Sequence, residues 1–538
     1  MKKLNKMTTQ EKLDVILRPL SDEQIDSLSA NELKLLLKGE QKLRQVYEEI
    51  IKDQKELNKQ LEDKQLQIEG QLVRLKCRLF CPQSERSKPA EKNPLVPKEK
   101  RRPLPKNRDL RKRYPDAEVI EKEVRLENLP ACPCCQKTMK EMGLFEESQH
   151  LTVIPKKYLI TSILRMKYHC TKCHSAIVTA PQLPRVIPRG SYGDEFLVDV
   201  ALSKFCDLIP VDRYCEMAAR QGFLGLPSNS LYESIWRLGQ FALGVYELIR
   251  TEALDSLVFY ADETTHWMLE GAKNDHWYLW GFFTETACFF ECHDTRAGDV
   301  ATDVLSESEC RYFVSDAYTG YGKAIRESNE LRKLAGLDAI IEVLCNAHAR
   351  RNFNDCLEIK QEKEILINPD AEFFITEYKE IYKVEKEVKA LLPLNFDEAA
   401  KKRAELECHF TRMKEKSEGD LSRYSSHHGY YGACQYFLNN YTGLSACLND
   451  PRIPLDNNLS ERGLRSPVVG RKTWYGTHSE KGAEAMSIHF TLVESCKLNG
   501  VNPREYYHAV IDAIHYKRPL FTPSQYKKKT ATVQENKT

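Results

Sequence analysis

The chain has 538 residues, too many for a single domain, and its 41% hydrophobic and 29% charged residues are ordinary for a soluble protein. Its net charge of +2 gives no indication of a nucleic-acid partner by itself, and no apolar run is long enough to span a membrane. Because eighteen cysteines occur without a signal-peptide core at the N-terminus, we expect a cytoplasmic protein with free thiols or a metal site.

The first 116 residues divide into a helical segment and a basic linker. In residues 1–81, Leu36, Leu43 and Ile50 recur at intervals of seven, which predicts a leucine-repeat coiled coil or a long helical hairpin. A coiled coil would make the protein a homo-oligomer, whereas the alternative is an amphipathic helix packed on its own chain. Residues 82–116 are rich in Pro, Lys and Arg and predict an extended linker. Its charge either attracts DNA phosphates or belongs to a solvated tether.

Residues 117–182 contain two Cys-x2-Cys pairs, which predict a zinc ribbon-like domain. Four thiolates from two such knuckles form a closed tetrahedral site for one structural Zn²⁺. Cys134 lies between two ligands of the first knuckle, and we do not expect it or His174 to bind the metal. The alternative is a set of buried free thiols. The predicted ligands are Cys132, Cys135, Cys170 and Cys173.

Residues 183–250 predict a helical region. Helices are expected over 194–208, 211–221 and 229–243, with a glycine-containing turn before the last one. This order resembles a helix-turn-helix, which would recognise DNA, although helical hairpins are also common in protein cores.

Residues 251–350 contain apolar runs that predict five strands, at 257–261, 276–283, 287–292, 311–315 and 340–344, with a helix over 297–306. Acids close two of these strands: Asp262 and Glu263 follow the first, and Asp316 follows the fourth. If the two strands are adjacent, Asp262 and Asp316 lie side by side, as carboxylates that hold divalent metals for phosphoryl transfer do. Three strands, helix, strand, helix, strand is the order of an RNase H-like core, so the predicted class is α/β.

The rest of the chain predicts an interruption of this core. Residues 351–450 are charged and helical, which predicts an all-α insertion, and the core resumes over 451–516 with C-terminal helices. Residues 517–538 are polar and predict a disordered tail.

Cys345 and His348 follow the fifth predicted strand with a spacing that suits half of a metal site. The alternative is a packing cysteine and an orienting histidine. Further along, Pro454 and Asp456 predict a helix start, which places Glu461 one turn into that helix.

Six motifs, in order, resemble the large transposase of the insertion sequence 66 family, a DDE-type enzyme. The leucine-repeat N-terminus and the two-knuckle segment also fit that family, so the resemblance spans nearly the whole chain. Thr473, Tyr475 and Asn346 depart from the family pattern, but these positions are peripheral to the acids. The motifs are ADET at 261–264, SDAYTGY at 315–321, CNAHARRNF at 345–353, LDNNLSERGLR at 455–465, VGRKTWYG at 469–476 and ESCKLNG at 494–500.

The resemblance implies a catalytic triad of Asp262, Asp316 and Glu461. These acids would hold two Mg²⁺ ions, or Mn²⁺ in their place, with Asp316 bridging the two. Glu263 and Asp456 are the nearby competitors for these roles. Trp474 either stacks on a base or fills the core. Basic residues near the acids in sequence are candidate DNA contacts: Arg350, Arg351, Arg462, Arg465, Arg471 and Lys472.

We therefore expect a DNA transposase that binds the ends of its mobile element and a target DNA, then cuts and joins strands. The alternatives are a nuclease of the same fold and a non-catalytic DNA-binding relative. Small accessory proteins, which such relatives often have, are candidate partners. A membrane partner is not expected, and the expected location is the cytoplasm, in association with the bacterial nucleoid.

Overall fold

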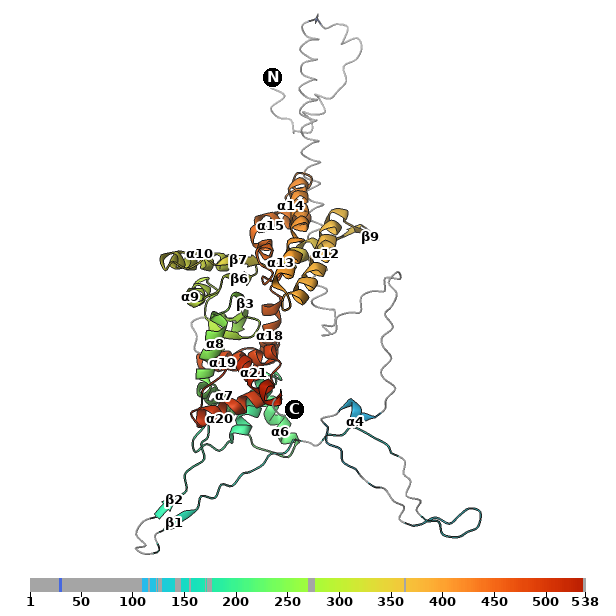
Figure 1. Ribbon diagram of the computed structural model, residues 1–538, viewed down its shortest axis with the longest axis vertical. Helices are drawn as coiled ribbons and strands as arrows, with labels where there is room; N and C mark the ends of the chain where they lie inside the picture. The colour runs from blue at the N-terminus through green and yellow to red at the C-terminus, as the bar shows by residue number, and fades with distance from the viewer. Residues whose placement is uncertain are drawn as a thin grey trace, which may run out of the picture. The chain divides into compact units, whose positions relative to one another are not determined.

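The computed structural model describes residues 29–30 and 109–535, apart from 115–116, 122, 124–127, 141–146, 154–155, 170, 172–176, 270–275 and 362–363 (Figure 1). The chain divides into two compact units, one of Met1–Pro89 with Glu418–Gln435 and one of Ala90–Ser417 with Tyr436–Thr538. In the described part of the first unit, the Tyr430 hydroxyl donates to Asp420 at 2.6 Å. The predicted coiled coil of 1–81 and most of the linker of 82–116 lie outside the described residues.

A five-stranded mixed sheet is the centre of the second unit, with the strand order β5-β4-β3-β6-β7. The first three strands in the chain pair antiparallel, and β6 and β7 run parallel to β3. Parallel neighbours need a crossover connection, and helices α9 and α10 supply it on either side of β6. The strands are β3 (Val258–Trp267), β4 (His276–Phe283), β5 (Cys288–His293), β6 (Tyr312–Ser315) and β7 (Ile341–Leu344), and the helices are α9 (Asp299–Glu307) and α10 (Thr319–Leu334).

The predicted end of the first strand at residue 261 is wrong, since β3 continues through the two acids to Trp267. The reason lies in its partner: β4 pairs with β3 from Tyr260 opposite Phe283 to Trp267 opposite His276. The hydrogen-bonded ladder therefore extends the strand beyond its apolar run. Asp262 lies within the strand rather than at its end.

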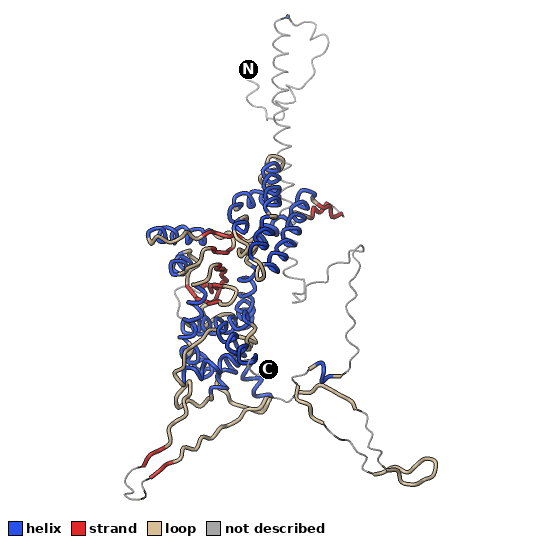
Figure 2. Tube along the Cα trace, viewed as in Figure 1, coloured by secondary structure: helices blue, strands red, loops and turns tan. Residues whose placement is uncertain are grey.

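Different helices pack on the two faces of the sheet, and Figure 2 shows the strands lying among helices. On one face, Phe313 and Trp280 pack on Tyr321 of α10, with ring centroids 5.6 and 5.8 Å apart. On the other face, Phe290 packs on Phe490 of α19 (Glu480–Asn499), with centroids 6.1 Å apart. Because successive strand residues alternate between faces, each acid on β3 belongs to one face only.

Helix α19 is buried along most of its length among the other helices of this part of the chain. The His489 side chain joins two of them, since Nε2 lies 2.9 Å from the Ile235 carbonyl and Nδ1 lies 2.7 Å from the Tyr507 hydroxyl. The helices predicted over 183–250 are present, although recognition of DNA by α6 and α7 stays a prediction. These helices are α5 (Asp194–Phe205), α6 (Val211–Arg220), α7 (Ser228–Phe241), α8 (Leu243–Leu254) and α20 (Pro503–His515).

Residues 351–450 are mostly helical, but the predicted all-α insertion also contains a hairpin of β8 (Glu358–Gln361) and β9 (Glu364–Ile367). The β-branched residues of this short segment suit a strand, and the two strands pair with each other. The helices are α11 (Asn346–Asn354), α12 (Pro369–Leu391), α13 (Phe396–Ala404), α14 (Glu407–Leu421), α15 (Gly429–Asn439), α16 (Tyr441–Leu444) and the 3-10 helix η2 (Ala446–Asn449).

The predicted disordered tail is also wrong in part, because α21 (Pro523–Glu535) is a helix. Tyr526 packs on Tyr506 and Phe521, with ring centroids 5.7 and 5.6 Å apart, and Ser524 donates to Glu252 at 3.0 Å. These contacts anchor a segment whose composition alone reads as polar. No helix in the described part of the chain combines the length and the hydrophobicity that crossing a membrane requires.

Candidate active site

Asp262 and Asp316 lie next to each other on one face of the sheet. Strands β3 and β6 are parallel neighbours, with Val258 opposite Tyr312 and Tyr260 opposite Val314. Continuing this register by two residues brings Asp262 opposite Asp316, which directly follows β6. Strands β3 and β6 are thus adjacent, as predicted, and the Asp316 charge is one of those that raise the pKa of Asp262.

Glu263 points to the opposite face and has its own cation. Its side chain is 3% exposed, accepts from Arg296 Nε at 2.8 Å and also accepts from the Tyr321 hydroxyl. Within the described residues, neither Asp262 nor Asp316 forms an ion pair with a basic side chain. Their oxygens accept from backbone instead, Asp262 from the Glu263 N–H at 2.9 Å and Asp316 from the Tyr318 N–H at 3.1 Å. Because strand residues alternate between faces, Glu263 pairs with Arg296 on one face, whereas Asp262 lies on the other face and has no ion pair in the described part of the chain.

Glu461 reaches this face from a short helix, α17 (Asn458–Gly463), which packs on β3 and β4. Gly463 allows this approach, because a Cβ there would lie 2.0 Å from Phe283. The residue before the helix, Asn457, is buried and donates from Nδ2 to the Ala261 carbonyl at 3.0 Å. One side chain thus connects the helix that carries Glu461 to the strand residue before Asp262. We did not predict this role, since an Asn before a helix usually signals only a cap.

The electrostatics of Asp262 reflect this convergence of acids. Burial, together with the neighbouring carboxylates of Glu263, Asp316 and Glu461, raises the pKa of its carboxyl group to about 7, against one backbone hydrogen bond that lowers it. Carboxyl groups with a strongly raised pKa are common at functional sites, where burial and neighbouring like charges shift the pKa of catalytic and metal-binding acids.

Cys345 and His348 lie beside the acids. Cys345 directly follows β7, and its N–H donates to the carbonyl of Ser315, the residue before Asp316. His348 is in the first turn of α11, where its Nε2 lies 3.7 Å from Glu461 Oε1. Among the described residues, Cys345, His348 and Glu461 form a group whose ligand atoms all lie within 4.8 Å of one another.

Five of the six predicted DNA-contacting residues are exposed and, within the described residues, have no carboxylate partner. They lie on α11, on α17 and on α18 (Arg465–Trp474), the helices next to the acids. Such side chains are available to phosphates. The five are Arg350, Arg351, Arg462, Arg465 and Lys472.

The sixth, Arg471, is half-buried and turned toward β3. Its guanidinium donates to Thr264 Oγ1 at 3.1 Å and to the carbonyl oxygen of Thr265. Contact with DNA by Arg471 would have to compete with these bonds. Trp474, on the same helix, packs edge-on against Phe205 with centroids 6.4 Å apart, and Lys204 lies 4.2 Å from its ring centroid. This packing favours the interpretation of Trp474 as a core residue.

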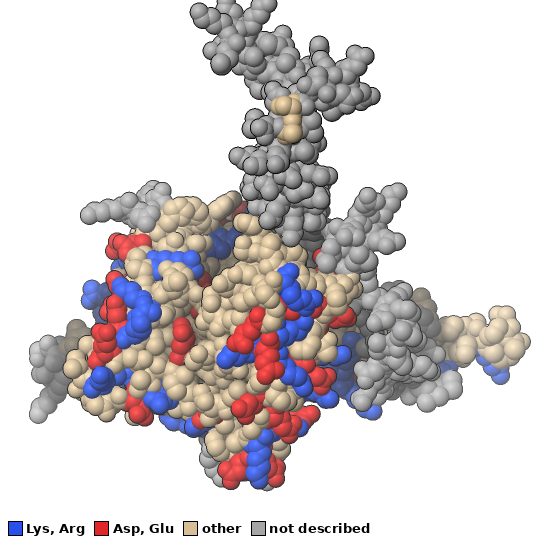
Figure 3. Space-filling model, turned by 90° about the horizontal axis from the view of Figure 1, so that it is seen from above, with Lys and Arg blue, Asp and Glu red and all other residues tan. Residues whose placement is uncertain are grey.

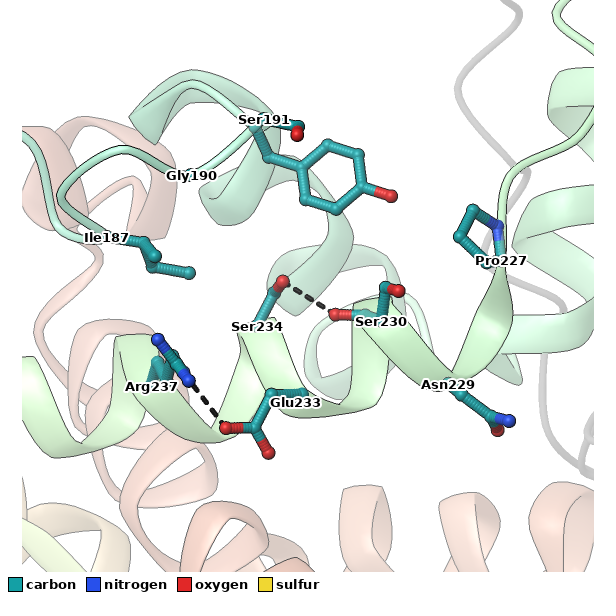
Figure 4. A pocket seen from close by; sticks show the side chains of 10 residues that line it. Ile187, Gly190, Ser191, Pro227, Asn229, Ser230, Glu233, Ser234 and Arg237 are labelled. Atoms are coloured by element: carbon teal, nitrogen blue, oxygen red, sulfur yellow. Dashed lines mark hydrogen bonds and ion pairs between the residues drawn. The ribbon is translucent and has the colours of Figure 1, made fainter.

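A pocket of about 580 Å³ lies along α7, away from the acids (Figure 4). In Figure 4, Arg237 points toward Glu233, with which it pairs at 2.9 Å, and Ser234 points toward the backbone of Ser230. The charges on this side of α7 therefore compensate one another. The face of the molecule in Figure 3 likewise shows basic and acidic side chains interspersed rather than one basic field.

Of the predicted zinc ligands, Cys132 and Cys135 are described, while Cys170 and Cys173 lie outside the described residues. The first knuckle is a tight turn, in which the Gln136 N–H donates to the Cys132 carbonyl at 2.9 Å. The backbone N–H groups of Cys135 and Cys134 lower the pKa of the Cys132 thiol. The second knuckle falls in the connection between the paired strands β1 (Lys167–His169) and β2 (Ile177–Thr179), and a short helix, α4 (Leu110–Arg113), precedes both knuckles.

Acids within β3 and directly after its parallel neighbour β6, with exposed basic residues on nearby helices, define an α/β protein suited to phosphate-containing ligands. Comparison with known families is more specific. The profile described as "Transposase IS66 family" matches residues 189–485, and the profile described as "zinc-finger binding domain of transposase IS66" matches residues 130–174. The first match covers more than half of the chain, which therefore belongs to the IS66 transposase family.

Two relatives match this chain over about three quarters of its length, and both are described as uncharacterized. The chain is 24% identical over 423 residues to "Uncharacterized protein y4hP" of Sinorhizobium fredii (strain NBRC 101917 / NGR234), covering 75% of this chain and 74% of the relative. It is 25% identical over 413 residues to "Uncharacterized protein y4jD" of the same strain, covering 74% and 76%. Membership of the family implies DNA transposition, and its zinc-finger domain implies zinc and DNA binding.

Proposed function

We propose that this protein binds the ends of its mobile element and catalyses metal-dependent cleavage and transfer of DNA strands. Asp262, Asp316 and Glu461 are the proposed catalytic acids. The observation that carries the proposal is the Asp262 carboxyl group, whose pKa is raised by burial and by the charges of Glu263, Asp316 and Glu461. Family membership supports the class of reaction, and the cluster of acids around Asp262 is where we propose that the reaction takes place.

The donor set suits Mg²⁺ or Mn²⁺. Carboxylate oxygens are the ligands that these hard cations prefer, and neither Asp262 nor Asp316 forms an ion pair in the described part of the protein. Glu263, by contrast, pairs with Arg296, whose charge also acts on Asp316. Asp262 and Asp316 therefore have the chemistry of ligands for the two ions that this class uses.

Two bound divalent ions would activate the attacking hydroxyl group and stabilise the leaving oxygen. The chain itself orients the acids: the register of β3 and β6 holds Asp262 beside Asp316, and Asn457 holds α17 against β3. The exposed basic side chains of α11, α17 and α18 would bind the DNA backbone on either side of the scissile phosphate.

The sheet supports assignment to the RNase H-like class. Three antiparallel strands are followed by two parallel ones; Asp262 lies on β3, and Asp316 directly follows the adjacent strand β6. We also propose one structural Zn²⁺ on Cys132, Cys135, Cys170 and Cys173, in a module that contributes to recognition of the element ends.

A strand-transfer assay with element-end DNA, target DNA and Mg²⁺ tests the proposal. Wild type should give joined products, and Asp316→Asn should lower the rate by at least about a thousandfold, as loss of essential catalytic groups does. The matched control is Asp338→Asn, since Asp338 is 85% exposed and outside the site. Nicks without joining would indicate a nuclease, and DNA binding without cleavage a non-catalytic relative. Equal activity of wild type and Asp316→Asn would refute the assigned triad.

A further inference from the structure

Cys345, His348 and Glu461 converge from two distant parts of the chain. Cys345 lies at the end of β7 and His348 one turn later on α11, so the helix start places both on one side. Glu461 comes from α17, more than a hundred residues away in sequence, and its oxygen completes a group with ligand atoms within 4.8 Å of one another. His348 and Glu461 are about one-third exposed, so the group is open to solvent on one side.

The imidazole of His348 has no hydrogen bond in the described part of the protein. Its Nδ1 is buried without a partner, and its Nε2 is 3.7 Å from Glu461, which is beyond hydrogen-bonding range. A buried polar atom without a partner is costly, and a metal ion bound through Nδ1 would remove that cost.

The Cys345 sulfur is surrounded by backbone N–H donors. The Asn457 N–H donates to it at 3.2 Å, and the N–H groups of Ala347 and His348 at the start of α11 also approach it. Burial raises the pKa of the Cys345 thiol, and these donors offset part of that rise. A bound metal ion would favour the thiolate, the form of cysteine that binds metals.

We propose that Cys345, His348 and Glu461 bind one Zn²⁺ ion in a second site, separate from the four cysteines of the zinc-finger domain. One sulfur, one nitrogen and one carboxylate oxygen are the donors that Zn²⁺ accepts, with the fourth position open to solvent, whereas Mg²⁺ prefers oxygen alone. A Zn²⁺ ion that binds Glu461 on the side of Cys345 and His348 draws this carboxylate away from Asp262 and Asp316. Zinc at this site therefore inhibits DNA cleavage. The inhibition rests on the proposed function, but the binding does not.

Cobalt titration of the full-length protein, with its zinc-finger domain already loaded with Zn²⁺, tests the binding. Wild type should take up about one Co²⁺ per chain with the near-ultraviolet absorption of a cobalt–thiolate bond. Cys345→Ser should abolish that absorption. His348→Ala should weaken binding by more than the roughly 10–100-fold that loss of an outer-shell partner costs. Cys356→Ser, two residues beyond the end of α11, is the control and should behave as wild type.

Equal thermal unfolding of wild type and variants without added metal controls for misfolding. Unchanged cobalt absorption in Cys345→Ser, or none in folded wild type, would overturn the site and leave His348 as an orienting group only.

Cleavage assays with Mg²⁺ test the inhibition separately. Micromolar Zn²⁺ should slow wild type, and the ratio of rates with and without Zn²⁺ should return toward one in Cys345→Ser and His348→Ala. Equal inhibition of wild type and both variants would overturn the inhibitory role. If cobalt binds as expected but Glu461→Gln cleaves normally, the metal site stands and the catalytic role of Glu461 fails, so the two proposals are distinguishable.

Discussion

Replacement of Asp262 by Asn should stabilise the protein in the absence of metal, although it removes a proposed catalytic group. The pKa of the Asp262 carboxyl group rises from its ordinary 3.8 to about 7 on folding. At about 1.36 kcal/mol per pKa unit, this difference means that ionised Asp262 costs the folded state roughly 4 kcal/mol. The Asp262→Asn side chain is similar in size and carries no charge, so it avoids this cost.

The pH dependence has a definite sign. Between 3.8 and about 7 the folded protein binds more protons at Asp262 than the unfolded chain does, so this group lowers stability as pH rises through that window. Above the window its effect is constant, and below it the effect vanishes. The stabilisation by Asp262→Asn should therefore be about 4 kcal/mol near pH 8 and about 2 kcal/mol near pH 5.

Urea unfolding of wild type and Asp262→Asn with EDTA, at both pH values, measures this difference. Asp338→Asn, at an exposed acid, should shift stability little at either pH. Adding Mg²⁺ should stabilise wild type more than Asp262→Asn, because the ion binds the folded state through this carboxylate. Destabilisation by Asp262→Asn near pH 8, or the same shift at both pH values, would refute the reasoning.

Three further predictions concern contacts around the site. Asn457→Ala leaves the buried Ala261 carbonyl unpaired, so unfolding experiments should show a loss of about 1–3 kcal/mol and cleavage should slow, while the exposed neighbour Asn458→Ala should change neither. Arg403→Met removes the buried partner of Glu385, which keeps only its pair with the exposed Lys389, and frees the Pro451 and Ile453 carbonyls; a loss of about 3–5 kcal/mol is expected, and adding Glu385→Leu should recover much of it. Cys132→Ser should lower the zinc bound at the finger, measured by atomic emission, and Cys134→Ser should not; equal zinc in both variants would contradict the ligand set.

Local sequence patterns located most of the elements. Four of the five predicted strands lie within one residue of the observed ones, because short apolar runs bounded by polar residues are typical of buried strands. The errors have a common physical origin. The extension of β3 to Trp267, the β8–β9 hairpin and helix α21 all depend on partners that pair or pack with them, and local composition does not reveal those partners.

The sequence by itself determined the family, the strands and the two aspartates that become neighbours, since these depend on short motifs and on the register of an apolar run. Only the tertiary structure decided that Asp262 and Glu263 face opposite sides of the sheet with different partners. It also decided that Asn457 reaches Ala261, 196 residues away, and that Glu461 meets Cys345 and His348. These contacts join residues far apart in the chain, and the packing of helices on the sheet, rather than any local preference, brings them together.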